Sequence, residues 1–332
     1  MAPGLTVCFG EIMLRLTPPG CLRIGQARSY EAWFAGSEGN VAVALAAWGV
    51  PSSMVTKVPD NPVGEALVAE LRRSKVDVTH VHKGGPRLGV FFVEKAASQR
   101  APRVVYDRAH SSLAEASAAE FDWEAILANA CWLHLSGITP ALSPAMEETV
   151  AQACRAAKLR QATISMDINY RRALWTPERA GRSLTGLLPM VDVTITNREH
   201  ASLLFGIGGS DGGPAETVRG LQARFGCRTV AITTRQGESA SQTQFGALLH
   251  QGDEYVSSRT HCIEVIDQVG SGDAFTAGII YGLQNELSPQ ETVEYAAAAA
   301  CLKHTIPGDF CECSAAEVRM HALGEGSGRL VR

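Results

Sequence analysis

Short apolar runs alternate with longer stretches of helical period along most of the chain. Runs such as Leu5–Phe9 and Thr229–Thr233 have the length and composition of buried strands, whereas Asn40–Trp48 repeats its apolar residues with the period of a helix face. The other expected strands are Ser53–Val58, Ala130–Leu135, Ala162–Asp167 and Val191–Thr196, and the other expected helices are Val63–Ser74, Pro144–Ala157, Pro177–Leu188, Arg198–Phe205, Asp273–Leu283 and Pro289–Lys303. This rhythm predicts an α/β fold with a mostly parallel sheet covered on both faces.

Two regions, 13–34 and 87–110, break this rhythm. They contain β-prone pieces such as Gly89–Val93 and Arg103–Tyr106 without an intervening helix. We expect them to be excursions that form a small sheet over the main domain. A chain of 332 residues allows one large α/β domain with an appendage or two modest domains. The excursions favour a single domain, 1–332, that carries the small sheet as a lid.

Composition and charge exclude several classes of protein. The chain is 45% hydrophobic and 19% charged, which is typical of a globular enzyme. A net charge of −4 with scattered Lys and Arg predicts no nucleic-acid or membrane partner, and no apolar run reaches the ~18–20 residues of a membrane span. The nine cysteines are expected to be reduced and mostly buried, which predicts a cytoplasmic protein. Cys311 and Cys313 lack further ligands at zinc spacing, so no metal site is predicted.

The most informative segment is Asp267-Gln268-Val269-Gly270-Ser271-Gly272-Asp273, which opens an expected helix. Glycines at a helix start expose backbone N–H groups, which favour an anion and above all a phosphate. An aspartate at the same place can meet a substrate hydroxyl beside that phosphate. The alternative is an ordinary helix start with Asp273 in the first turn. Neither a P-loop nor a dinucleotide-binding fingerprint is present.

A second polar cluster stands at the entry of the expected helix near residue 40. Gly36, Ser37 and Asn40 would form a cradle for a polyol, with Asn40 and the Gly36 backbone bonding hydroxyls. The alternative is that Ser37 caps the helix and Asn40 is merely helical. Taken alone, this segment does not decide between the two.

Together and in this order, the two segments resemble the signature motifs of the ribokinase-like (PfkB-type) carbohydrate kinases. That resemblance implies a three-layer αβα fold with a small β lid, and it implies ATP and Mg²⁺ as cofactors. It implies that Asp273 is the catalytic base. It also implies that the backbone amides of Gly270, Ser271 and Gly272 form an anion hole, although Ser271 stands where the family usually has alanine.

The resemblance covers nearly the whole chain and is strongest to one branch, the 2-keto-3-deoxygluconate kinases. The segments that carry it are Gly10–Leu16, Tyr106–Ala109, Ser136–Leu142, Asp167–Arg171 and Leu302–Phe310. Ribokinases and many fructokinases carry an aspartate for a neutral sugar in the neighbourhood where this chain has Arg15. The implied sugar site consists of Gly36, Ser37, Asn40, Phe91, Tyr106, Arg108, Arg171 and Asp309.

Two arginines of that site favour an acidic substrate. Arg108 and Arg171 match the branch's substrate-contacting arginines, and a guanidinium can bind a carboxylate through two parallel hydrogen bonds. Without the family, a surface or structural ion pair is the alternative for either residue. Phe91 stands where the branch often has tyrosine, so one polar contact to the substrate is lost.

The nucleotide side departs further from the family pattern. The residues implied for it are Asn169, Asn197, Thr233, Gly237, Gly270, Gly272 and Ala297, the last expected to face the adenine. His200 occupies the position of the glutamate in the family's Asn-x-x-Glu element, and Glu199 comes one residue early. A plain helix cap at Asn197 is the alternative for this element. Ala240 replaces the second glycine of the loop that begins at Thr233.

These features predict an ATP-dependent phosphotransferase that acts on a primary hydroxyl of 2-keto-3-deoxygluconate. Its expected partners are a sugar acid and ATP. Lids in this family often pair into dimers, so the resemblance also implies a homo-oligomer formed through the lid. One alternative is a fructokinase or another sugar or sugar-acid kinase of the same family. Another is a catalytically weak, sugar-binding regulator, supported only by the altered Asn-x-x-Glu element. The sequence leaves the epimer of the sugar acid open.

Overall fold

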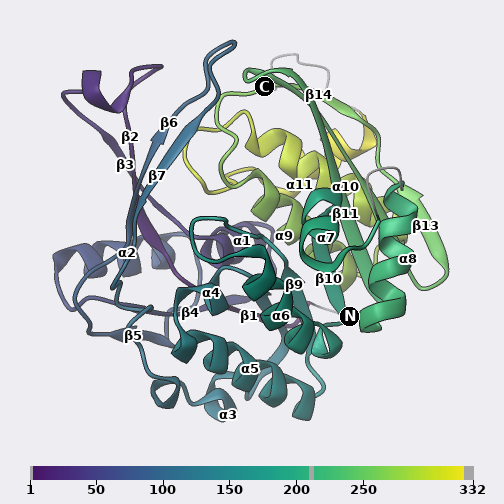
Figure 1. The fold of residues 1–332 in the computed structure, drawn as a ribbon, viewed down its shortest axis with the longest axis horizontal. Helices are drawn as coiled ribbons and strands as arrows, with labels where there is room; N and C mark the ends of the chain where they lie inside the picture. The colour runs from purple at the N-terminus through teal and green to yellow at the C-terminus, as the bar shows by residue number, and fades with distance from the viewer. Residues whose placement is uncertain (1–2, 209–212, 325–332) are drawn as a thin grey trace.

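The computed structural model describes residues 3–208 and 213–324, which form a sheet between two helical layers (Figure 1). The central 10-stranded sheet has the order β13-β12-β11-β10-β9-β8-β1-β4-β5, and β14 pairs with β12. Its strands are β1 (Leu5–Phe9), β4 (Ser52–Val58), β5 (Val81–Lys83), β8 (Ala130–Ser136), β9 (Thr163–Asp167), β10 (Val193–Asn197), β11 (Thr229–Ser239), β12 (Gln242–Gln251), β13 (Glu254–Ser257) and β14 (His261–Glu264). Neighbours from β5 to β11 run parallel and β12 to β14 add antiparallel pairs, so the mostly parallel sheet is confirmed.

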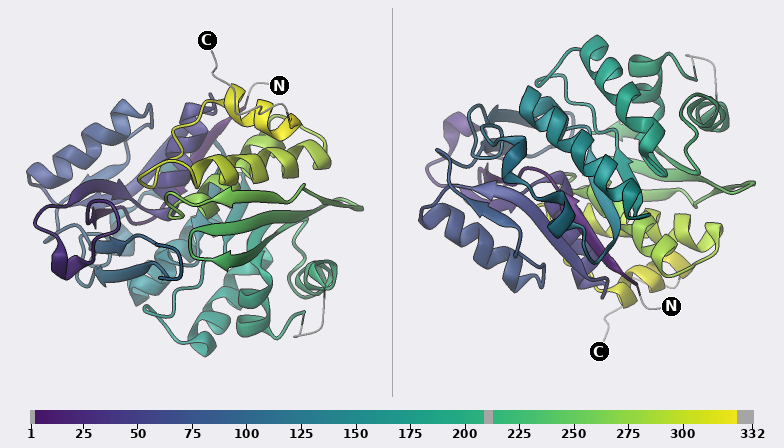
Figure 2. Two further views of the ribbon diagram at one scale, coloured as in Figure 1. Left: turned by 90° about the horizontal axis from the view of Figure 1, so that it is seen from above. Right: turned by 90° about the horizontal axis from the view of Figure 1, so that it is seen from below.

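Helices cover both faces of this sheet, as Figure 2 shows in its view from above. One face carries α1 (Ser37–Ala47), α2 (Pro62–Arg73), α9 (Ser271–Gln284), α10 (Pro289–Lys303) and α11 (Ala315–Leu323). The other carries α3 (Trp123–Ile126), α4 (Thr139–Leu142), α5 (Pro144–Leu159), α6 (Pro177–Leu187), α7 (Arg198–Phe205) and α8 (Pro214–Phe225). Each layer buries its own apolar cluster, because both faces of a parallel sheet must be shielded from water.

A second, four-stranded sheet projects from this body in the order β3-β2-β6-β7 (Figure 1). Its strands are β2 (Met13–Thr17), β3 (Glu31–Ala35), β6 (Val90–Glu94) and β7 (Arg103–Asp107), and they come from the two regions that break the α/β rhythm. Its small apolar cluster contains Phe91, and Val269 packs against that cluster. The second sheet therefore reaches the loop that precedes α9.

The start of α1 differs from the expected one. The helix begins at Ser37 rather than at Asn40. Its N-cap residue is Gly36, not Ser37, so the alternative in which Ser37 caps the helix does not hold. A side chain at position 36 would clash with the backbone oxygen of Glu11, so only glycine allows this close approach. The serine hydroxyl is thereby left available for another partner.

Two further sequence expectations concern the cysteines and the membrane. All nine cysteines are free, and all except Cys21, Cys131 and Cys262 are buried. Among the described helices, none combines the length and the apolar character needed to cross a bilayer.

Candidate active site

Asp273 lies in the first turn of α9, and two side chains from the first turn of α1 hold its carboxylate. Ser37 Oγ donates a hydrogen bond to Asp273 Oδ1 at 2.8 Å, and Asn40 Nδ2 donates to Oδ2 at 2.6 Å. Both helices belong to the same layer of the sandwich. The two polar segments that the sequence analysis singled out therefore meet at one point.

Opposing influences act on the charge of this carboxylate. Burial is the largest and raises the pKa of Asp273, because a charged group loses hydration. The hydrogen bonds from Asn40 and Ser37 lower the pKa, as do the positive charges of Arg171 and Lys303. The side chains around Asp273 thus favour its anionic form against the cost of burial.

Two more carboxyl groups lie near Asp273, the buried Glu38 and the half-buried Asp167, and neither was predicted as a site residue. Burial, and then the charge of Asp273, raise the pKa of Asp167 to about 7. Burial likewise raises the pKa of Glu38 to about 7, although its Oε1 accepts hydrogen bonds from Ser136 Oγ and Thr139 Oγ1 at 2.7 and 2.8 Å. Carboxyls that titrate near neutral pH beside a third acid are typical of sites that handle protons.

The segment 267–272 at the start of α9, here called the glycine loop, bounds a cavity of about 350 Å³. The lining residues are Val104, Tyr106, Asp167, Asn169, Arg171, Ile195, Thr196, Asn197, His200, Thr233, Arg235 and residues 268–273. Gly270 has a left-handed φ of +84°, and a side chain there would clash with the backbone oxygen of Asp309. The Ser271 amide, which was expected in the anion hole, instead donates to the Gln268 carbonyl at 3.3 Å. The start of α9 and the positive charges of Arg171 and Arg235 make this cavity attractive to a phosphate.

A buried ion cluster lies behind this loop. Arg15 is fully buried, and its Nη1 and Nη2 bond Asp309 Oδ2 and Asp267 Oδ2 at 2.7 and 2.6 Å. Asp309 was expected in the sugar site, but the structure places its carboxylate here, 3% exposed and taken by Arg15. Arg15 likewise has no access to a ligand, so this cluster holds the loop rather than a substrate.

A larger cleft of about 720 Å³ lies between β7 and the segments around residues 141–143 and 171–174. Tyr106 and Arg171 line both this cleft and the smaller cavity, so the two are adjacent. Arg108 lines the cleft as well, but its Nε and Nη2 are bound by the buried carboxylate of Glu11. The guanidinium also lies over the Tyr106 ring, 5.6 Å from its centroid. Arg108 is therefore oriented by a partner that sequence reasoning missed.

The remaining predicted sugar-site residues support their neighbours. Phe91 is buried and stacks on Tyr106 with ring centroids 5.7 Å apart, so it positions the tyrosine. The Gly36 amide donates to Asn40 Oδ1 at 3.3 Å, which orients the asparagine towards Asp273. Asn169, which was predicted for the nucleotide side, lines the smaller cavity, has a φ of +36° and donates to Ser37 Oγ at 3.0 Å.

The residues predicted for the nucleotide side divide into two groups. Asn197 and Thr233 line the smaller cavity, and Asn197 Oδ1 caps α7 by accepting from the His200 amide at 2.8 Å. Gly237 is exposed on β11 and is not part of that lining. Ala297 is completely buried in the core, which corrects the expectation that it faces the adenine. In the alanine-rich α10, sequence alone does not distinguish a core position from a binding one.

Sequence reasoning missed Arg235, which comes from β11. Its Nη2 donates to Ser271 Oγ at 3.1 Å and lies 2.8 Å from His304 Nε2. Burial, and then the nearby charge of Arg235, lower the pKa of His304 to about 4, so this histidine is neutral and accepts from the arginine. Asp167 was also missed, but it could have been found from the sequence. It ends β9, and ligands of α/β sheets bind at the carboxyl ends of parallel strands.

Comparison with known proteins shows which family and which relatives this chain is similar to. Residues 4–309 match the pfkB family carbohydrate kinase profile. The 2-dehydro-3-deoxygalactonokinase of Haloferax volcanii is 32% identical over 322 residues, 97% of this chain and 98% of that protein. The 2-dehydro-3-deoxygluconokinase of Bacillus subtilis is 27% identical over 92% of this chain and 90% of its own length. The crystal structure of 2-dehydro-3-deoxygluconokinase from Thermotoga maritima is 39% identical, with a TM-score of 0.95 over 97% of this chain and 99% of that one.

Proposed function

Because this chain belongs to the pfkB family of carbohydrate kinases, we propose that it phosphorylates 2-keto-3-deoxygluconate, also called 2-dehydro-3-deoxygluconate, at its primary hydroxyl with ATP. The product would be the 6-phospho acid. The observation that carries the proposal is the position of Asp273 beside the glycine loop, where a hydroxyl and a phosphate can meet. Relatives named as kinases of 2-dehydro-3-deoxy sugar acids support the substrate class.

In this mechanism Asp273 accepts the proton of the attacking hydroxyl. Its two oxygens are fixed by Ser37 and Asn40, so the base is oriented before the substrate arrives. Both hydrogen bonds favour the anion, which is the form that can take a proton. A sugar hydroxyl that lies against Asp273 also lies against the start of α9.

The phosphoryl group is bound on the other side of Asp273. Phosphoryl transfer depends mainly on alignment and charge neutralisation, and the remaining free amides of the glycine loop together with Arg235 provide both. Mg²⁺ bound with ATP would neutralise further phosphate charge. The Asp167 carboxylate in the same cavity is an oxygen ligand of the kind Mg²⁺ accepts, directly or through water.

The sugar acid is assigned to the larger cleft. Arg171 lines both cavities, so its guanidinium can reach a substrate whose hydroxyl is at Asp273. Glu11 occupies Nε and Nη2 of Arg108, and Nη1 makes no hydrogen bond to any residue that the structure describes. The small sheet carries Tyr106, and Arg108 directly follows its strand β7, so closure of the sheet would also exclude water and limit wasteful hydrolysis of ATP.

The test is a coupled assay of ADP release with ATP, Mg²⁺ and a panel of substrates. The panel contains 2-keto-3-deoxygluconate, its galactonate epimer, fructose and ribose. We expect kcat/KM to be highest for the 2-keto-3-deoxy acids. A preference for fructose or ribose would reject the sugar-acid assignment and leave only the family. No turnover with any sugar would favour a sugar-binding regulator.

A further inference from the structure

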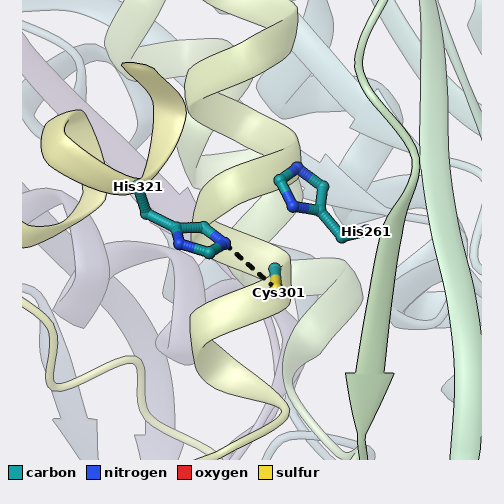
Figure 3. A group of neighbouring side chains, drawn as sticks. All are labelled: His261, Cys301 and His321. Atoms are coloured by element: carbon teal, nitrogen blue, oxygen red, sulfur yellow. Dashed lines mark hydrogen bonds between the residues drawn. The ribbon is translucent and has the colours of Figure 1, made fainter. Parts of the chain in front are cut away.

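Three side chains of the types that bind transition metals converge where α10, α11 and the start of β14 meet (Figure 3). His261 begins β14, Cys301 lies in α10 and His321 lies in α11. One ligand atom from each lies within 4.8 Å of the other two. The centroids of the two imidazole rings lie 5.1 Å apart, and the ring planes are inclined by 27° to each other. None of these residues takes part in the proposed kinase reaction.

Hydrogen bonding within the protein does not account for this arrangement. His321 Nε2 lies 3.3 Å from Cys301 Sγ, so this pair is satisfied (Figure 3). His261 Nε2, in contrast, is buried and has no hydrogen-bond partner among the described residues. A buried nitrogen without a partner costs free energy, and such groups call for a ligand, an ion or a water.

Two of the three groups are already in the protonation state that binds a metal, and the thiol would have to lose its proton. Burial lowers the pKa of His261 and of His321, so both imidazoles are neutral at physiological pH and offer a lone pair. Burial raises the pKa of the Cys301 thiol to about 11. A metal ion would therefore displace the thiol proton to solvent, and the thiolate charge would be balanced by the ion.

We propose that His261, Cys301 and His321 form a binding site for a borderline-soft transition-metal ion, for which Zn²⁺ is the probe. Two imidazole nitrogens and a thiolate match the ligand preference of Zn²⁺, and a water would complete a tetrahedron. Tetrahedral bonds of zinc length place such ligand atoms about 3.3–3.6 Å apart. The ligand atoms lie within 4.8 Å of one another, so binding would require side-chain rotations that bring them closer.

The surrounding charges leave room for a cation. The positive charge of Arg259 acts against a bound cation, since it lowers the pKa of both histidines. Its Nε, however, lies 3.4 Å from the Glu294 carboxylate, which raises the pKa of His261, so the two charges offset each other. The bound ion would tie α11 to α10 and β14, so its main effect should be on the stability of the C-terminal helix.

The experiment titrates reduced, metal-free full-length protein with Zn²⁺ by calorimetry and with Co²⁺ by absorbance. We expect one ion per chain, a sulfur-to-cobalt charge-transfer band, and a Tm that rises on adding Zn²⁺. Cys301→Ser should abolish the band and weaken binding by more than the roughly 10–100-fold that outer-shell partners contribute. His321→Asn should weaken binding similarly. The matched control is Cys262→Ser, which removes an exposed thiol next to His261 and should keep both the band and the affinity.

Three results would overturn the proposal. If Cys301→Ser still binds Zn²⁺, the ion is held by an adventitious group elsewhere. If Cys262→Ser loses binding to the same extent as Cys301→Ser, the binding is likewise adventitious. Absence of binding by the folded, reduced wild type would mean that the cluster is only a packed hydrogen-bonded pair. If Cys301→Ser fails to fold, His261→Asn replaces it, because His261 is only partly buried and makes no hydrogen bond at Nε2. All readouts concern the metal, so failure of the kinase proposal does not affect them.

Discussion

Asn40 and Asp273 are separated by 233 positions in the chain, yet Asn40 Nδ2 donates to Asp273 Oδ2 at 2.6 Å. This hydrogen bond joins the first turns of α1 and α9. With Ser37 on the other oxygen, it leaves the aspartate little freedom to rotate. The proposed base is therefore preorganised, and its donors favour the charged form against burial, which raises the pKa of Asp273.

The pH dependence of catalysis should follow from this hydrogen bond. A base works only when deprotonated, so kcat/KM falls as the pH drops through the pKa of Asp273. Asn40→Ala removes a donor that lowers this pKa, so the acid limb of the profile should move to higher pH. The measurement is kcat/KM against pH for 2-keto-3-deoxygluconate. Asn61→Ala, which removes the cap of α2, is the matched control and should keep the wild-type limb. An unmoved limb in Asn40→Ala would contradict the account.

The ion cluster behind the glycine loop should matter for stability. Arg15→Ala leaves the carboxylates of Asp267 and Asp309 buried without their partner, and such a loss typically costs about 3–5 kcal/mol in the free energy of unfolding. Urea denaturation measures this cost. Arg73→Ala is the control, because Arg73 pairs with Glu70 at the surface and should cost under about 1 kcal/mol. Equal costs would show that the cluster is energetically unimportant.

Substrate class should depend on Arg171. A charge-assisted pair with a carboxylate is worth roughly 1.5–3 kcal/mol, so Arg171→Ala should lower kcat/KM for the sugar acid about 10–100-fold. The loss on fructose should be much smaller, since fructose has no carboxylate. Arg171→Lys should restore activity only in part, because an ammonium lacks the two-pronged geometry. Equal proportional losses on both substrates would instead assign Arg171 to ATP or to the fold.

Arg108 calls for a different design, because Glu11 is bound to it. Arg108→Ala should show the same selective loss, but it also leaves the Glu11 carboxylate buried and unpaired. Adding Glu11→Gln to Arg108→Ala should restore the stability that was lost while leaving the sugar-acid defect in place. Recovery of kcat/KM in the double variant would show that Arg108 acts only through the fold. The measurements are urea denaturation and kcat/KM for the two substrates.

Activity should require Mg²⁺ or Mn²⁺, because the transferred group carries several negative charges. Within the described residues, the only cluster of three or more metal-binding side chains is His261, Cys301 and His321, away from the phosphate cavity. We therefore expect the catalytic ion to arrive with ATP and to be held mainly by phosphates and water. Excess chelator should abolish ADP release, and added Mg²⁺ should restore it. Full activity in chelator would refute this requirement.

Local signals in the sequence account for most of the fold. The predicted bounds of α7 and α10 match the structure, because Asn197 and Ser288 supply recognisable caps and Pro289 a recognisable start. The hairpin of β11 and β12 was harder to predict. Its outer part carries Gln, Thr and Ser residues rather than an apolar alternation, so only Thr229–Thr233 stood out as a strand.

The site was less accessible to sequence reasoning, because its partners are distant along the chain. Asp273 was found from a local glycine motif, but Arg15 bonds residues 252 and 294 positions away. No periodicity encodes such pairs, so Asp309 was expected to face a sugar. The pairing of Arg108 with Glu11 was missed for the same reason.

The turnover of the Asp273→Asn variant tests the central claim most directly. Asparagine keeps the size and the hydrogen-bonding reach of the side chain but cannot accept the proton of the sugar hydroxyl. Using 2-keto-3-deoxygluconate and Mg·ATP, kcat should fall at least ~10²-fold, while the Tm and the Kd for ATP stay near those of the wild type. Near-wild-type turnover by a folded Asp273→Asn variant would contradict the assignment of Asp273 as the base.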